Sequence, residues 1–156
     1  MVGRRKPAVT TSVRPWREFE LLTRWGERWI PSRRTDRFGR RDDAAVFAVE
    51  GGRLQAVACD AMIDGVHWDA RWCTPREAGW RVAAANLSDL AAVGARPERG
   101  FLVLALPRRA THRTADDVVA GVVKALRTYG ADLAGGDTVA TPGPLTAALT
   151  LQGSVP

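Results

Sequence analysis

The sequence predicts a layered α/β (α+β) domain, in which two central helices cover one face of a mixed, mainly antiparallel sheet. Apolar runs of strand length alternate with two long segments that have helical periodicity and clear start signals. The expected order is helix, strand, strand, helix, strand, helix, short strand and strand, which is typical of helices packed on one side of a sheet. The 156 residues suffice for one such domain with its own core.

The N-terminal part is expected to hold a basic leader and one helix. Residues 1–15 are basic and lack periodicity, so we expect a disordered leader. Large apolar residues then recur at helical spacing, and Pro31 ends the run: Trp16, Phe19, Leu22, Trp25 and Trp29. This stripe is either a packing face within the chain or a surface that a partner helix or subunit covers.

Two short apolar runs around a glycine turn predict a β-hairpin. The runs are Ala44–Val49 and Leu54–Cys59, and Glu50-Gly51-Gly52 separates them. In a hairpin the start of the first strand lies beside the end of the second. We therefore expect Asp43 and Asp60 to lie near each other, with Asp60 opening a loop after the strand.

Start and stop signals predict two long helices. Thr74, Pro75 and Glu77 form a capping pattern, and Gly94 ends the helix that follows. A second helix is expected from a cap at Thr114 to Gly130. Three polar residues interrupt the Ala-rich first helix, and they either form its solvent side or face a ligand: Asn86, Ser88 and Asp89.

The remaining segments supply strands and one glycine-rich turn. Phe101–Leu106 and Leu145–Leu151 are predicted strands. Gly135-Gly136-Asp137 is predicted to be a turn, preceded by a short strand at most. Two glycines there would let backbone N–H groups approach an anion, although an ordinary turn explains the same residues.

The charge distribution limits the class of partner. Residues 1–41 hold 12 basic and 4 acidic residues, whereas the remainder holds 11 and 13, so the net charge of +6 is an N-terminal property. A basic arm can tether nucleic acid, but 21 of the 23 basic residues are Arg, which points to a codon bias instead. No apolar run has the ~20 residues of a membrane helix, and we expect a cytoplasmic protein whose two cysteines stay reduced.

Carboxylates at four places in the sequence suggest a divalent cation. Their positions are Asp42/Asp43, Asp60, Asp89 and Asp137. Such charges would repel one another if gathered, and oxygen ligands without a His or Cys cluster favour Mg²⁺ bridged to phosphate. The implied chemistry is phosphoryl transfer. The chain has neither the glycine-lysine phosphate loop nor the protein-kinase signature.

Four motifs in this order resemble the N-terminal domain of thiamine-monophosphate kinase, within the superfamily of aminoimidazole ribonucleotide synthetase. Each motif is modest alone, and the four together cover the chain from about residue 16 to its end. They are Asp42-Asp43-Ala44-Ala45-Val46, Asp60 with Asp64-Gly65-Val66-His67-Trp68, Asn86 to Pro97, and Gly135-Gly136-Asp137-Thr138.

The resemblance implies ATP-dependent phosphorylation of thiamine monophosphate by direct transfer, with Mg²⁺. The residues that match the family's metal ligands are Asp43, Asp60, Asp89 and Asp137. Gly136 and Asp137 match a nucleotide-phosphate contact, and His67 matches a residue at the substrate phosphate. The resemblance also implies that the sheet pairs with that of a second subunit in a barrel-like homodimer, which would bury strand edges.

Three departures from the family pattern leave other interpretations open. Arg41 replaces a glycine, and Ala58 and Cys59 replace a Ser-Thr pair whose oxygens contact metal. The thiol of Cys59 is thus a poor candidate ligand for Mg²⁺. We also expect residues 16–156 to form the family's N-terminal ATP- and Mg²⁺-binding domain alone, without its C-terminal domain. A non-catalytic nucleotide-binding or dimerisation module, or a relative acting on another phosphorylated small molecule, is the alternative to a kinase.

Overall fold

The computed structural model describes residues 17–28 and 43–156, which belong to two separate units. The first contains helix α1 (Glu18–Arg28), which confirms the centre of the predicted N-terminal helix. Phe19, Leu22 and Trp25 are exposed along it within this unit. Trp16, Trp29 and the predicted leader over residues 1–15 lie outside the described residues.

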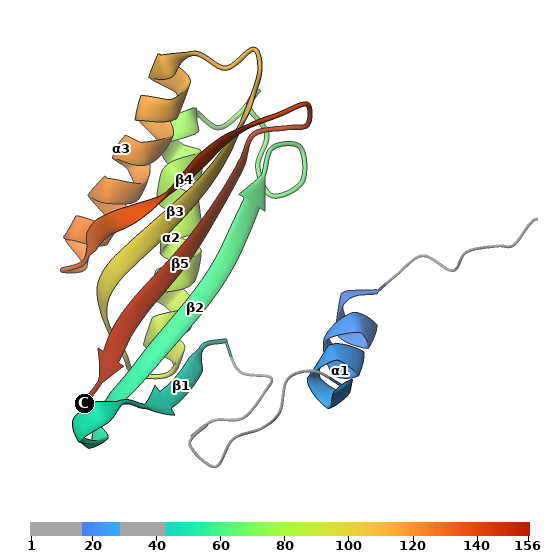
Figure 1. Cartoon of the computed structure of the whole chain (residues 1–156). Helices are drawn as coiled ribbons and strands as arrows, with labels where there is room; N and C mark the ends of the chain where they lie inside the picture. Colours follow the sequence, from blue (N-terminus) through green and yellow to red (C-terminus); the bar gives the residue numbers. More distant parts are fainter. Residues whose placement is uncertain (1–16, 29–42) are drawn as a thin grey trace, which may run out of the picture. The chain divides into compact units, whose positions relative to one another are not determined.

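The second unit is a five-stranded sheet with two helices on one face (Figure 1). The strand order is β1-β2-β5-β3-β4, and every neighbouring pair is antiparallel except β3 and β4. This confirms the predicted mixed, mainly antiparallel sheet. The elements are β1 (Ala45–Ala48), the single turn η1 (Glu50–Gly52), β2 (Leu54–Ile63), α2 (Pro75–Ala92), β3 (Arg96–Pro107), α3 (His112–Thr128), β4 (Asp132–Thr141) and β5 (Thr146–Val155).

The two faces of the sheet differ in what covers them. Leu102 on β3 pairs with Leu149 on β5, and both side chains are buried under α2 and α3. We call this the covered face. The residues that alternate with these form the open face, where Phe101, Val103 and Val139 are 41%, 46% and 45% exposed. The core therefore lies between the sheet and the helix pair.

Capping boxes fix the start of both long helices. The Thr74 hydroxyl accepts from the Glu77 N–H, and the Glu77 carboxylate accepts from the Thr74 N–H, as the sequence predicts. The second box was predicted one turn too late. Thr111 is the N-cap of α3 and Thr114 is its third helical residue, because the two threonines cap each other reciprocally.

The two helices approach each other through glycine. A Cβ added to Gly79 of α2 would lie 2.0 Å from the Val118 carbonyl oxygen, and one added to Gly121 of α3 would lie 2.0 Å from the Arg76 carbonyl oxygen. Neither position can hold a larger residue unless the helices separate. The helix pair is therefore packed backbone against backbone.

Strand boundaries are the main difference from the prediction. β2 continues to Ile63, so Asp60 lies inside the strand and does not open a loop. Gly135-Gly136-Asp137 lies inside β4 and is not a turn. In both cases hydrogen bonds to a neighbouring strand, β5 or β3, extend the strand beyond its apolar run.

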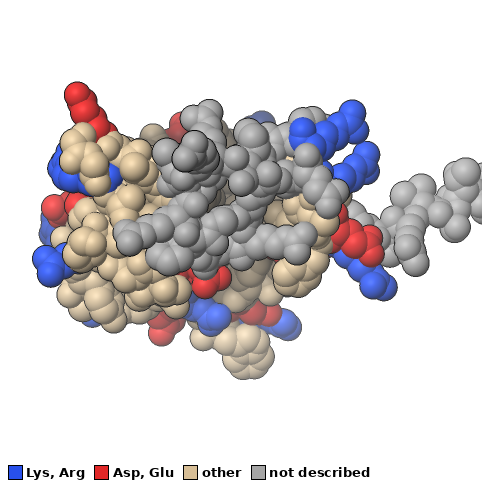
Figure 2. Space-filling view, turned by 90° about the horizontal axis from the view of Figure 1, so that it is seen from below, with Lys and Arg blue, Asp and Glu red and all other residues tan. Residues whose placement is uncertain are grey.

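The described surface carries charges of both signs. On the face drawn in Figure 2, both Lys or Arg and Asp or Glu side chains are visible among the described residues. Within the described ranges, no helix has the length and apolar character needed to span a membrane.

We predict that Gly121→Ala destabilises the protein by about 1–3 kcal/mol, because the added methyl group overlaps the Arg76 carbonyl. Helix propensity alone would favour alanine by up to about 1 kcal/mol, so the sign of the change decides between the two effects. Urea unfolding measures it. Gly143→Ala is the matched control, since its Cβ would meet only the Thr141 hydroxyl at 3.4 Å. Equal stabilities of the two variants would contradict the close helix contact.

Candidate functional site

Asp60 lies on the covered face of the sheet. Its register partner is Leu149, which is fully buried, and its neighbours on the same face of β2 are Ala58 and Met62. Asp60 itself is exposed, whereas Ala58 is buried. The strand thus carries its carboxylate to the place where the helix layer stops covering it.

Asp43, Asp60 and Asp89 come within electrostatic reach of one another. Asp89 is half-buried on α2, and burial raises the pKa of its carboxyl, with the charges of Asp60 and then Asp43 raising it further. The hairpin register pairs Ala45 with Val57, which brings the segment before β1 alongside the segment that holds Asp60. The predicted proximity of Asp43 and Asp60 is therefore found.

Asp137 lies apart from these three residues within one chain. It pairs with Val103, which is on the open face, and the same row continues through Ala148 to Ala61. Three strand spacings separate the ends of this row, or about 14 Å. Within one chain, Asp60 and Asp89 thus lie on the covered side, with the charge of Asp43 acting on Asp89, whereas Asp137 lies on the edge strand.

The glycine before Asp137 has a role in strand pairing. Gly136 has φ 152°, and a Cβ there would lie 1.8 Å from the Leu102 carbonyl oxygen. The close approach of β4 to β3 accounts for this glycine by itself. The predicted nucleotide contact of Gly136 and Asp137 is thus not needed to explain the residue type.

His67 lies in a tightly bonded loop directly after β2. Its Nδ1 accepts a hydrogen bond from the Ile63 N–H at 3.1 Å, and Asp64 Oδ1 accepts from the Ala70 N–H at 3.2 Å. In the neutral ring the proton then resides on Nε2. His67 is exposed, so Nε2–H is a donor that the loop holds in a fixed orientation.

An ion pair that sequence reasoning missed braces the rest of this loop. Arg71 donates to both oxygens of Asp69 and holds the pKa of that carboxyl down, at about 2. The Arg71 guanidinium also lies over the Trp72 ring, 5.9 Å from its centroid, and Trp72 is 83% exposed. An Asp two residues before an Arg, where an Asx turn can form, was the available signal.

The two departures beside Asp60 point in opposite directions. Ala58 is on the covered face and buried, whereas Cys59 is exposed on the open face. The Thr150 hydroxyl donates to Cys59 Sγ at 3.4 Å. Neither residue places an oxygen next to the Asp60 carboxylate, so the metal ligands that the family pattern expects here are not supplied.

One fully buried polar residue lies on α2 one turn before Asp89. Asn86 is 0% exposed and its Nδ2 donates to the Val82 carbonyl at 2.9 Å, but its Oδ1 has no partner. An unsatisfied buried acceptor costs about 1–3 kcal/mol. Of the three polar residues that interrupt α2, Ser88 is exposed and only Asn86 is buried.

The donor set fits Mg²⁺ if water or phosphate completes its coordination. Among the described residues, no three His, Cys, Asp or Glu side chains gather closely enough to hold a metal ion alone. Mg²⁺ usually needs only one or two carboxylates, because it keeps waters and binds phosphate oxygens. Burial and then the charges of Asp60 and Asp43 raise the pKa of Asp89, and a cation between Asp60 and Asp89 would oppose both effects.

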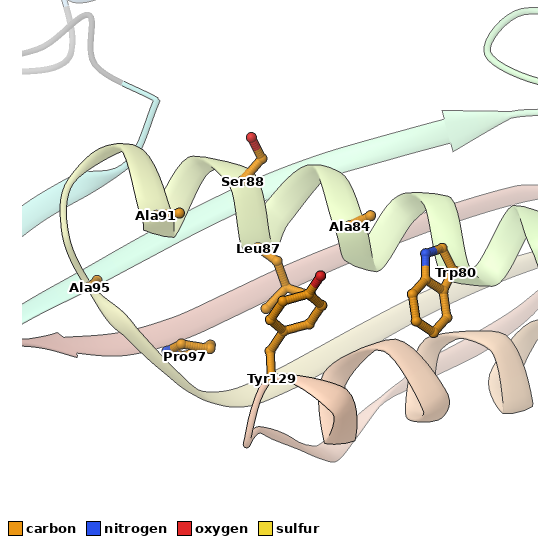
Figure 3. Close-up of a pocket in the computed structure, with 8 residues that line it drawn as sticks. All are labelled: Trp80, Ala84, Leu87, Ser88, Ala91, Ala95, Pro97 and Tyr129. Atoms are coloured by element: carbon orange, nitrogen blue, oxygen red, sulfur yellow. The ribbon is translucent and has the colours of Figure 1, made fainter.

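A separate hollow of about 350 Å³ lies on the outer side of α2 (Figure 3). Trp80 and Leu87 of α2 line it together with Tyr129 and Pro97, and the Ser88 hydroxyl points away from it. None of the four candidate acids lines this hollow. We therefore place the candidate site at the carboxylates, where the titratable groups interact, and not at this apolar hollow.

Comparison with known proteins agrees with this fold and these motifs. Residues 41–155 match the family model of AIR synthase related protein, N-terminal domain. The thiamine-monophosphate kinase of Synechococcus elongatus is 39% identical over 116 residues, which are 74% of this chain and 35% of that protein. The one from Bacillus subtilis is 32% identical over 138 residues, 88% of this chain and 42% of that protein.

The fold also matches solved structures. That of AaThiL complexed with AMPPCP and TMP superposes with a TM-score of 0.76 at 23% identity, covering 88% of this chain and 41% of that one. The chain thus spans less than half the length of the relatives that it matches. Because the family model covers most of the chain, this protein belongs to the AIR synthase related family, through its N-terminal domain.

Proposed function

We propose that the chain is the nucleotide- and metal-binding part of a thiamine-monophosphate kinase, which transfers phosphate from ATP to thiamine monophosphate. The observation that carries the proposal is the grouping of Asp43, Asp60 and Asp89, where burial and then the charges of Asp60 and Asp43 raise the pKa of the Asp89 carboxyl. Relatives named thiamine-monophosphate kinase, at 32% and 39% identity, support the choice of reaction.

In this proposal each site residue has a chemical role. Asp60 and Asp89, with Asp43 beside them, hold Mg²⁺, which would neutralise charge on the transferred phosphoryl group. His67 donates Nε2–H to the phosphate of the substrate, because its Nδ1 is already bonded to Ile63. We assign the reaction to the cytoplasm, where free Cys59 and Cys73 stay reduced.

The proposed enzyme is a homodimer in which the open faces of two sheets enclose a barrel. The support is the half-exposed apolar surface of Phe101, Val103 and Val139, which a single chain leaves uncovered. β1 and β4 are the two edges of the sheet, so closure of the barrel brings β4 of one subunit towards β1 of the other. Asp137 would then serve the metal and nucleotide site of the partner.

A non-catalytic nucleotide-binding or dimerisation module is the second candidate. Ala58 and Cys59 favour it, because neither supplies an oxygen ligand beside Asp60. This module predicts nucleotide binding without turnover, and turnover would not appear after Ala58→Ser and Cys59→Thr.

We predict that the full protein, including any sequence that follows Pro156, converts thiamine monophosphate to the diphosphate with ATP and Mg²⁺. Asp60→Asn should lower kcat at least 100-fold, because Mg²⁺ loses a carboxylate ligand and no longer neutralises the charge on the phosphoryl group. Product formation followed by chromatography measures this.

A mixture of Asp60→Asn and Asp137→Asn chains tests the shared site. If each site takes Asp137 from the partner, mixed dimers contain one intact site, and part of the activity returns. Activity that stays absent in the mixture would contradict the shared site without affecting the kinase assignment, whereas an inactive parent would contradict the kinase assignment itself.

We predict that Val103→Asp makes the protein monomeric, because it puts a charge at the centre of the open face. Light scattering after gel filtration measures the mass. Tyr129→Asp puts the same charge on an exposed apolar side chain of the helix layer and should leave the dimer intact. A dimer that survives Val103→Asp would rule out the open face as the interface.

We predict that Asp89→Asn stabilises the metal-free protein at neutral pH. Because the pKa of Asp89 is raised on folding, the folded state binds its proton more tightly, so stability falls as pH rises from the unfolded to the folded pKa. The gain from Asn should therefore be largest above that window and fade below pH 4. Thermal melts across pH measure this, and Mg²⁺ should stabilise the parent but not the variant. A gain that does not depend on pH would contradict the raised pKa of Asp89.

A further inference from the structure

We propose that Asn86 is a positioning residue for the cation site. Its Oδ1 accepts a hydrogen bond from a water molecule that is shared with the cation held by Asp60 and Asp89. This inference rests on the proposed cation site, and it assigns a role to a residue that makes no direct contact with substrate.

The first argument is that the fold alone does not explain an amide at this position. Asn86 is completely buried in α2, between Val82 and Leu90 on the side that faces the sheet. Its Nδ2 is satisfied within the helix by the Val82 carbonyl, but its Oδ1 is unpaired. A leucine of similar size would fill the same space among these apolar neighbours without an unsatisfied acceptor.

The second argument is that Asn86 lies one helical turn from the candidate carboxylate of Asp89. Asn86 and Asp89 are three residues apart on α2, so their Cβ atoms are about 5–6 Å apart. Asp60 is on the face of the sheet that α2 covers. One water molecule spans about 5.5 Å between two oxygen atoms, which is the scale of the spacing between side chains one helical turn apart.

The third argument is that the hydrogen bonds of such a water balance. The water donates one hydrogen to Asn86 Oδ1 and the other to a carboxylate oxygen, and its oxygen faces the cation. An amide oxygen can accept this bond without adding negative charge beside the carboxylates. The arrangement orients a water that Mg²⁺ keeps in its coordination shell.

Asn86→Leu tests the proposal, because its two expected effects have opposite signs. Without metal the variant should melt at a higher temperature than the parent, since the unpaired acceptor is gone. Its affinity for metal should be 10–100-fold weaker, the usual loss when a group that orients a ligand is removed. Calorimetric titration with Mg²⁺ and electron paramagnetic resonance titration with Mn²⁺ measure the affinity. Ser88→Ala, at the exposed neighbour on the same helix, should change neither quantity.

Two results would overturn the proposal. If Asn86→Leu leaves the metal affinity unchanged, Asn86 has a purely structural role. If the parent binds neither Mg²⁺ nor Mn²⁺, there is no cation for the water to position. If the leucine variant does not fold, Asn86→Ser replaces it: a hydroxyl keeps an acceptor for the water, and the metal affinity should fall less than 10-fold. Asn86→Ala, which has no acceptor, is the comparison. If Asn86→Ser loses as much metal affinity as Asn86→Ala, the water bridge is contradicted.

The kinase assignment is tested separately. An inactive parent whose metal affinity still depends on Asn86 would remove the proposed reaction and leave this inference intact. An active enzyme whose metal affinity does not depend on Asn86 would support the proposed reaction and contradict this inference.

Discussion

The backbone contact between α2 and α3 is the constraint on which the rest of the domain depends. At Gly79 and Gly121 each helix fills the space where the other would carry a side chain. The pair therefore behaves as one slab that lies on the covered face of the sheet. The position of the helix pair determines how far α2 extends over β2. It therefore determines where Asp60 becomes exposed and interacts with Asp89. Helix packing and site geometry are thus one property of this fold.

The candidate site is divided between the two sides of the sheet. Asp60 and Asp89 belong to the covered side, where they interact across the margin of α2, whereas Asp137 follows the open side on the edge strand. A single chain cannot bring these groups together, because β5 and β3 lie between them. This division leaves the candidate carboxylates of one domain in two separate places.

Local signals in the sequence predicted much of this structure. The Thr74 capping box, the glycine turn of the hairpin and the helix end at Gly94 depend on residues close in sequence, and each was found. Strand ends were less predictable. Asp60 and Gly135-Gly136-Asp137 have poor strand propensity, and distant strands supply the hydrogen bonds that extend β2 and β4 through them. The complete burial of Asn86 was equally invisible, since an Ala-rich helix can turn any side to the sheet.

The exposed edge of β4 affects how the protein must be handled as well as how it works. The strand runs for ten residues, and all but two of them are exposed. Its outer backbone groups can pair with any extended segment that they meet, including the β4 of another copy. Strand addition at this edge is therefore a risk whenever the chain is newly synthesised or concentrated. Asp132 and Asp137 place acidic side chains on this strand, and charged residues on an edge strand disfavour strand addition between copies.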